Sequence, residues 1–412
     1  MANTRQVLAV AASISWLTVV ASSTTALAQK KYDTGATDTE IRIGNIMPYS
    51  GPASAYGVIG KASEAFFRMI NDGGGINGRK IAFVSYDDAY SPPKTVEQTR
   101  KLVESDEVLL VFQPLGTAGN TAIQKYLNAK QVPQLFVASG ATKWGDPKRF
   151  PWTMGFQPNY QSEGRIYAKY ILEHHANGRI GVLYQNDDFG KDVLKGLKDG
   201  LGEKTSLIVA EASYEVSDPT ADSQIVRLKS ADANVFVDIS SPRFAAQAIR
   251  KVAELGWKPA HFISNVSGSI GSVLQPAGFE NARGIMSTAY TKDPSDPAWN
   301  DDVKMKGWHA FMDKYMPGAN KTDQGYISSY MATQTLIEVL RRCGDDLTRK
   351  NIMRQAAGFR DFEVDVLLPG IKVNTSPTDF FPVEQMQMRR FNGQVWELFG
   401  PIINGEVGSV TD

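Results

Sequence analysis

Short apolar runs alternate with longer amphipathic stretches over most of the chain. The runs are typical of buried strands, and the stretches repeat apolar residues every three or four positions, as a helix does. In the first part the predicted strands are Ile41–Ile46, Lys80–Tyr86, Val108–Phe112 and Gln134–Ala138. The predicted helices between them are Val58–Ile70, Val96–Val103 and Thr121–Asn128. This alternation indicates a parallel sheet with helices on both faces.

The alternation starts again after Pro151. Here the predicted strands are Arg179–Tyr184, Ser206–Ala210, Asn234–Ile239 and His261–Ser264. The predicted helices are Gly164–His174, Lys191–Leu201, Ser223–Ser230 and Phe244–Leu255. The second unit therefore repeats the architecture of the first, although not its sequence.

A third section begins near Gly284. It contains a predicted strand, Ile285–Tyr290, and two predicted helices, about Asp302–Tyr315 and Tyr326–Arg342. No low-complexity linker or block of charge separates the sections. We therefore expect an α/β fold of two lobes joined by several short crossings.

The end of the chain has the pattern of a β-hairpin. Asn392-Gly393, a preferred two-residue turn, separates the predicted strands Gln387–Phe391 and Gln394–Phe399.

The N-terminus has the features of a cleavable secretory signal. Arg5 precedes an apolar run from Leu8 to Val20, and Ala26-Leu27-Ala28 is a small-x-small cleavage pattern. The apolar run is shorter than the roughly 20 residues that a membrane span needs. We expect residues 1–28 to be a signal peptide and the mature chain to be soluble in the periplasm.

Composition narrows the function. The chain has 412 residues, with 44 Lys and Arg balancing 44 Asp and Glu, so its formal net charge is zero. Its length predicts two domains, and its charge balance argues against a nucleic-acid partner. The one cysteine, Cys343, excludes an intramolecular disulfide. The four histidines show no zinc-ligand spacing, so no metal is expected.

One glycine-rich motif invites a nucleotide interpretation that its context opposes. Gly73 to Gly78 match G-x-G-x-x-G, but a predicted helix precedes them and a predicted strand follows. A dinucleotide site needs the reverse order, so we interpret the motif as a turn that ends a helix. Asp87-Asp88 and Asp187-Asp188 lead into polar turns, where turn chemistry is their commoner role. We find no catalytic set and no cofactor motif, and expect a protein that is not an enzyme.

The segments after the predicted strands carry the informative chemistry, because ligands of open α/β sheets bind outside the carboxyl ends of the strands. In the first unit these segments are Met47 to Pro52, Gln113 to Thr117 and Ser139 to Thr142. They offer hydroxyls, glycines and helix N-termini, which bind carboxylates without a full positive charge. Thr117 and Thr142 can equally be mere helix caps.

At these segments the chain resembles the type I periplasmic binding proteins of the branched-chain amino acid class. The resembling motifs run from about residue 39 to 400: Ile41 to Gly44, Ser50 to Pro52, Tyr56-Gly57, Ile70 to Arg79 and Asp188 to Gly190. The resemblance implies two Rossmann-like, doubly wound lobes joined by three hinge crossings that close on a ligand. It divides the chain into lobe 1, residues 39–155 plus 285–358, and lobe 2, residues 156–284 plus 359–412.

The resemblance also implies site residues. Thr117 and Thr142 match positions whose hydroxyls hold the carboxylate of the ligand, and the backbone of Ser139, Gly140 and Ala141 would contribute beside them. Tyr56 matches a position that lines the side-chain pocket, and Phe189 matches the aromatic residue that covers the ligand from the other lobe.

One departure from the family bears on the ligand. Amino-acid binders of this class carry an acidic residue after a strand of the second lobe, but here the stretch is Ser240 to Phe244, with Phe244 at the acidic position. A buried ammonium without its partner loses about 3–5 kcal/mol, which is about two to three decades of affinity. We therefore hypothesise an aromatic acid such as a benzoate or hydroxycinnamate, held among Tyr56, Phe189 and Phe244. An amino acid stays open if another acid, such as Asp238, meets the ammonium.

The expected function is the extracytoplasmic solute-binding component of an ABC transporter. It would capture a small carboxylate, close as a monomer and present the ligand to a membrane permease. A periplasmic ligand-sensing receptor and an exported α/β enzyme are the alternatives of other classes.

Overall fold

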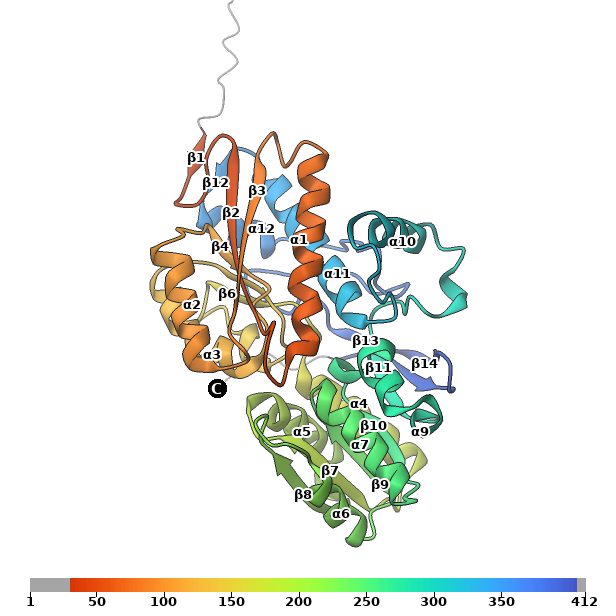
Figure 1. Ribbon diagram of the computed structural model, residues 1–412. Coiled ribbons are helices and arrows are strands. Elements are labelled where there is room, and N and C mark those ends of the chain that lie inside the picture. The colour runs from red at the N-terminus through yellow and green to blue at the C-terminus, as the bar shows by residue number, and fades with distance from the viewer. Residues whose placement is uncertain (1–29, 406–412) are drawn as a thin grey trace, which may run out of the picture.

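The computed structural model describes residues 30–405, and the predicted signal peptide lies outside the described residues. It contains two main β-sheets, each covered by helices (Figure 1). We call the sheet of five strands and its helices lobe one, and the sheet of seven strands and its helices lobe two. The predicted α/β fold with two lobes is confirmed.

Lobe one is a fully parallel sheet in the order β3-β2-β4-β5-β6. Its strands are β2 (Glu40–Met47), β3 (Lys80–Asp87), β4 (Leu110–Phe112), β5 (Gln134–Val137) and β6 (Thr153–Gly155). Its main helices are α1 (Gly57–Asp72), α2 (Pro92–Glu104), α3 (Thr117–Ala129), α10 (Val303–Tyr315), α11 (Gln324–Cys343) and α12 (Arg349–Ala356). Ile43 packs on the α1 and α11 side, whereas Ile46 packs on the α2 and α3 side. The residues of β2 thus serve both faces, as period-two alternation requires.

Lobe two is a mixed sheet in the order β14-β13-β11-β10-β9-β7-β8, in which β13 runs antiparallel to β11 and β14. Its strands are β7 (Ile180–Gln185), β8 (Ile208–Tyr214), β9 (Val235–Ile239), β10 (Ala260–Ile263), β11 (Met286–Ala289), β13 (Gln385–Phe391) and β14 (Trp396–Asn404). Its main helices are α4 (Tyr160–His174), α5 (Asp188–Leu201), α6 (Asp222–Ser230) and α7 (Pro242–Glu254). Val182 packs in the core that contains α4 and α5, and its neighbour Leu183 packs in the core of α6 and α7.

The shorter elements fill the ends of the lobes. They are β1 (Lys31–Tyr32), which pairs with β12 (Asp346–Leu347), and the short helices α8 (Gln275–Ala277) and α9 (Phe279–Ala282).

The chain passes between the lobes three times: after β6, after β11 and before β13. The strand pairing corrects the division predicted from the sequence. Residues 286–289 form β11, which pairs with β10 and therefore belongs to lobe two rather than lobe one. Residues 359–381, assigned to lobe two, lie against lobe one, where Arg342 stacks over Phe359 and Phe381 abuts Gly145.

Two predicted element boundaries are wrong for local reasons. The strand predicted at Ser206–Ala210 starts at Ile208, because Gly202–Leu207 forms a 3₁₀ turn in which the Thr205 hydroxyl bonds to the Gly202 carbonyl. The hairpin turn spans residues 392–395 rather than two residues. The Asn392 side chain accepts the N–H groups of Gln394 and Val395, which closes the longer turn.

The glycine-rich segment is a turn, as predicted. Helix α1 ends at Asp72 and β3 begins at Lys80, and the φ angles of Gly74, Gly75 and Gly78 are 103°, 82° and 82°. These positive angles suit glycine and no larger residue without strain.

We expect Gly75→Ala to destabilise the protein more than Gly78→Ala, although both glycines have the same φ angle. A Cβ at Gly78 meets nothing within 4 Å, whereas one at Gly75 overlaps the carbonyl of Arg79. The left-handed backbone alone costs about 1–2 kcal/mol, and only Gly75→Ala adds the steric cost. Urea unfolding followed by circular dichroism measures both variants, and equal losses would contradict this account.

Candidate ligand-binding site

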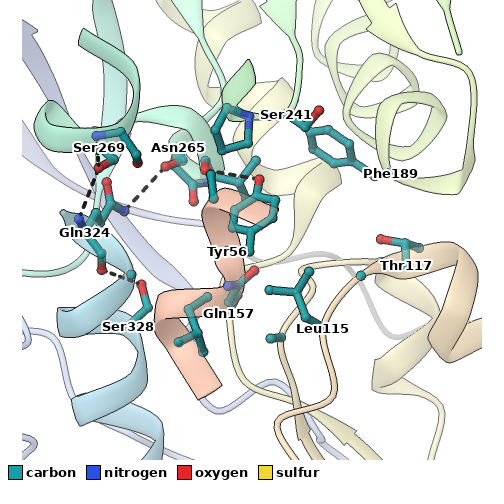
Figure 2. Close-up of a pocket in the computed structure, with 18 of the residues that line it drawn as sticks. Tyr56, Leu115, Thr117, Gln157, Phe189, Ser241, Asn265, Ser269, Gln324 and Ser328 are labelled. Atoms are coloured by element: carbon teal, nitrogen blue, oxygen red, sulfur yellow. Dashed lines mark hydrogen bonds between the residues drawn. The ribbon is translucent and has the colours of Figure 1, made fainter. Parts of the chain in front are cut away.

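A cavity lies between the lobes, where the strands of both sheets end (Figure 2). Lobe one contributes residues that follow β2 and β4, among them Tyr56, Leu115 and Thr117. Lobe two contributes residues that follow β7 and β9, among them Phe189 and Ser241. Both sheets thus point their carboxyl ends into one gap, which is where α/β sheets bind ligands.

The cavity is narrow and adjoins a wider cleft. Its volume is about 60 Å³, which exceeds the roughly 10–15 Å³ that a single buried water needs. A cleft of about 820 Å³ shares Ala55, Tyr90, Gln185 and Ser272 with it. Gln185 Nε2 approaches the Tyr90 hydroxyl to 3.5 Å between the two spaces. The lobes are therefore close together around the inner cavity.

Thr117 gives the cavity a hydroxyl donor at the start of a helix. It is the first residue of α3, it is almost fully buried, and its Oγ1 lies 2.7 Å from Ser139 Oγ. Ser139 Oγ already accepts hydrogen bonds from Trp144 Nε1 at 3.1 Å and Ala141 N at 3.3 Å. A hydroxyl has two acceptor lone pairs and one proton, so Ser139 donates to Thr117. The Thr117 proton is then left to donate into the cavity, beside the anion-attracting end of α3.

The first crossing supplies a ring and an amide to the cavity. Tyr160, the first residue of α4, donates its backbone N–H to the Gly140 carbonyl at 2.8 Å. Its ring meets Phe189 edge-on, with centroids 5.0 Å apart. Gln157 lies just before it, and its buried Oε1 has no hydrogen-bond partner among residues 30–405. The crossing therefore presents an unused hydrogen-bonding group to the cavity.

The N-terminus of α11 places a carboxylate in the cavity. Asp323 caps this helix by accepting the Gly325 N–H at 3.0 Å, and it also accepts the Ser269 hydroxyl of lobe two at 3.2 Å. Burial raises the pKa of Asp323 above its ordinary value, although these hydrogen bonds lower it. Gln324, the next residue, donates its backbone N–H to Ser269 Oγ at 3.3 Å.

A buried carboxyl behind the cavity holds one of its walls in place. Glu163 of α4 is fully buried and accepts hydrogen bonds from the Tyr167 hydroxyl and the Asn265 N–H, both at 2.6 Å. It also accepts the Ser264 hydroxyl at 3.1 Å. Burial raises the pKa of Glu163, against the effect of these donors. The carboxyl thereby fixes the loop after β10 that carries Asn265 to the cavity.

Polar contacts cross from lobe to lobe on both sides of the cavity. On one side, the backbone N–H and hydroxyl of Thr142 donate to Asp192 Oδ2 of α5 at 2.7 and 2.9 Å. Lys143 pairs nearby with Asp188 at 2.5 Å. On the other side, the Tyr56 hydroxyl donates to the Val266 carbonyl at 3.3 Å. The structure is therefore the closed arrangement of the two lobes.

Three of the site residues predicted from the sequence line this cavity: Tyr56, Thr117 and Phe189. Ser139, Gly140 and Ala141 lie behind its wall. Ser139 supports Thr117, and Gly140 packs so closely beneath Tyr160 that a Cβ there would contact its ring at 2.8 Å.

Two predicted site residues lie elsewhere, which corrects their assignment. The Thr142 side chain is engaged by Asp192 and Asn159 and does not line the cavity. Phe244 is fully buried in the core of α6 and α7, where it stacks on Tyr214 with ring centroids 4.0 Å apart. It lies on the inner face of α7, so it forms no part of an aromatic sandwich around a ligand. Asp238 is also fully buried and outside the cavity lining.

The sequence analysis missed Gln157, Tyr160, Asp323 and Gln324, which all line the cavity. The first two lie on the crossing after β6, a strand that the sequence analysis did not predict, and the last two begin a helix of the third section. Asp323 did carry a signal, because an Asp just before a helical pattern is a typical N-cap.

The sequence itself decides the family. A profile of the family described as periplasmic binding proteins matches residues 40–394.

The chain belongs to this periplasmic binding protein family.

Individual relatives agree with this assignment. The Leu/Ile/Val-binding protein homolog 1 of Brucella abortus (strain 2308) is 26% identical over 314 residues, which is 76% of this chain and 81% of the relative. A branched chain amino acid ABC transporter structure from Thermus thermophilus with bound valine superposes with a TM-score of 0.80 at 15% identity, over 89% of this chain and 97% of that one.

A neighbour with a different named ligand fits the same fold. The fatty acid ABC transporter substrate-binding protein of Thermomonospora curvata superposes with a TM-score of 0.76 at 18% identity, over 93% of this chain and 97% of that one. As a periplasmic binding protein, the chain belongs to a family of binding components rather than enzymes. Within residues 30–405, no helix is both long and apolar enough to span a membrane.

We expect Phe244→Leu to lower stability without affecting ligand binding, and Phe189→Leu to weaken ligand binding. Both phenylalanines are buried near the start of a lobe-two helix, but only Phe189 lines the cavity. Phe244→Leu lowers the free energy of unfolding by about 1–3 kcal/mol and leaves affinity unchanged. Phe189→Leu weakens binding by about tenfold, because aromatic contact is lost. Thermal unfolding and calorimetric titration give the two readouts, and weaker binding by Phe244→Leu would contradict its placement.

Proposed function

We propose that this protein captures a small carboxylic acid in the inter-lobe cavity and delivers it to the permease of an ABC importer. The observation that carries the proposal is the Thr117 hydroxyl, whose proton is free to donate into the cavity at the N-terminus of α3. A neutral donor at a helix N-terminus binds a carboxylate and can release it without a full ion pair to break.

An amino acid is the first candidate ligand. It is supported by the names of the relatives, which are Leu/Ile/Val-binding protein homologues, and by the bound valine of one structural neighbour. Asp238 does not serve the ammonium, since it lies outside the cavity. The acid that can serve it is Asp323.

An aromatic acid is the second candidate, and the cavity walls favour it. Aromatic rings from both lobes and from the crossings line the cavity: Tyr56, Tyr90, Tyr160, Phe189 and Tyr290. The segment after β9 offers serines and a proline in place of an acid. A benzoate or hydroxycinnamate would gain apolar burial and edge-on ring contacts there.

The proposal includes the export of the protein, its location and its oligomeric state. Residues 1–28 direct export and are cleaved, and the mature protein acts in the periplasm as a monomer. The two lobes open, take up the ligand and close around it. The closed surfaces of both lobes then dock on the permease.

We expect calorimetric titration of unfolded, ligand-stripped and refolded protein to show tight binding of at least one carboxylic acid. The panel is leucine, valine, benzoate and 4-hydroxycinnamate, with the amides of leucine and benzoate as controls that lack the carboxylate. The amides should bind at least tenfold more weakly, because Thr117 and the N-terminus of α3 favour an anion. Equal binding of acid and amide would refute the carboxylate site.

We expect Thr117→Val to weaken binding of the tightest acid by about tenfold or more, since a hydrogen bond to a charged group contributes about 1.5–3 kcal/mol. Thr142→Val is the matched control, because Thr142 lies on the same lobe and outside the cavity. It should have a smaller effect, through loss of the contact with Asp192 alone. The idea fails if Thr142→Val is the more damaging change.

A further inference from the structure

The two polar ends of the cavity lie on opposite sides of Tyr56, and this arrangement bears on which acids fit. Figure 2 shows Thr117 on one side of Tyr56 and Gln324 on the opposite side, both facing the same cavity. Asp323 directly precedes Gln324 at the start of α11. One end therefore offers a hydroxyl donor, and the other end offers a carboxylate acceptor.

The charges of the lining fix which end takes the carboxylate of the ligand. Within the described part of the chain, residues 30–405, the lining includes one acid, Asp323, and no Lys, Arg or His. The groups that contact Asp323 are uncharged: the hydroxyls of Ser269 and Ser272 and the N–H of Gly325. A ligand carboxylate beside it would be repelled, so the carboxylate belongs at the Thr117 end.

A buried arginine orients the neighbouring amide of Gln324. Arg389 is 3% exposed and donates from a terminal nitrogen to Gln324 Oε1 at 3.2 Å. Because arginine only donates, the oxygen of this amide must face Arg389 and its NH₂ group must face away. Gln324 Nε2 lies 3.4 Å from the Asn265 carbonyl. Gln324 therefore offers the cavity a donor, and Asp323 remains the acceptor at this end.

A second acceptor lines the same cavity without a partner. The Oε1 atom of Gln157 is buried and forms no hydrogen bond within residues 30–405. A buried acceptor without a partner costs free energy that a ligand donor would recover. The lining also contains apolar residues, with Ile59 and Leu115 packed with the ring of Tyr56.

Resting on the proposed function, we infer that the ligand is an elongated carboxylic acid with a hydrogen-bond donor at the end remote from its carboxylate, and that Asp323 accepts from this donor. An ω-ammonium group and a phenolic hydroxyl both supply this chemistry. An α-amino acid with an apolar side chain does not supply it, because its only donor is the ammonium on the carbon atom next to the carboxylate.

Matched pairs of probes test the inference by calorimetric titration of the full mature chain after ligand stripping. The pairs are 6-aminohexanoate with hexanoate and 4-hydroxycinnamate with cinnamate, and leucine is the α-amino acid. In at least one pair the member with the donor should bind at least tenfold more tightly than its partner, and more tightly than leucine. The pair that shows the difference identifies the donor as ammonium or phenol.

Asp323→Asn is the variant that attributes this preference to Asp323. Asparagine is a good N-cap, so α11 should still begin at the same place. The variant should reduce the preference for the donor-bearing probe by at least fivefold. The reduction should be larger for an ammonium than for a phenol, because the amide oxygen of asparagine still accepts a hydrogen bond but carries no charge. Asp302→Asn is the control, since Asp302 caps α10 outside the cavity lining; it should leave the preference unchanged.

The outcomes separate this inference from the proposed function. Tight binding of leucine, hexanoate or cinnamate with no preference for a remote donor overturns the inference and leaves a carboxylic acid binder. An unchanged preference in Asp323→Asn also overturns it. Failure of every acid in both panels overturns the proposed function and the inference together.

Discussion

The binding cavity depends on contacts that hold two separately formed sheets against each other. Neither lobe encloses the site alone, because Thr117 comes from one and Phe189 from the other. The joining contacts are few and polar, and the ion pair between Lys143 and Asp188 is partly exposed, with 35% and 46% of the two side chains accessible. Such pairs contribute about 0–1 kcal/mol, and ordinary hydrogen bonds contribute about 0.5–1.5 kcal/mol each. Each joining contact is therefore weak by itself, so a ligand that contacts both lobes can add a comparable contribution to closure.

The sequence predicted the fold well because its signals are local. Alternating short apolar runs and amphipathic stretches fix strand and helix types within each unit, and the sheets have the expected parallel core. The division into lobes was less accurate, since it depends on pairing between distant segments. Residues 286–289 belong to lobe two because they pair with β10. The hydrophobic periodicity of the sequence does not predict which strand they pair with.

The site was half predictable for a similar reason. Thr117 was found because the segments after parallel strands all lie at one edge of the sheet, and Tyr56 was found because it matches a position of the resembled family. Phe244 was misplaced because position after a strand does not say which face of the following helix looks inward, and here that face packs on Tyr214. Asp323 and Gln157 reach the cavity from a distant helix and from a crossing, and only the closed arrangement of both lobes brings them there.

The interleaving of the lobes along the chain has a consequence for how the protein is made. The apolar face of α1 is covered by α11, and Ser63 and Ser329 share a hydrogen bond at 2.8 Å although they are 266 positions apart. During synthesis the apolar face of α1 stays exposed to solvent until α11, near the end of the chain, has been made. Contacts between such distant segments also form slowly. A core that cannot be completed early therefore delays folding until most of the chain is available.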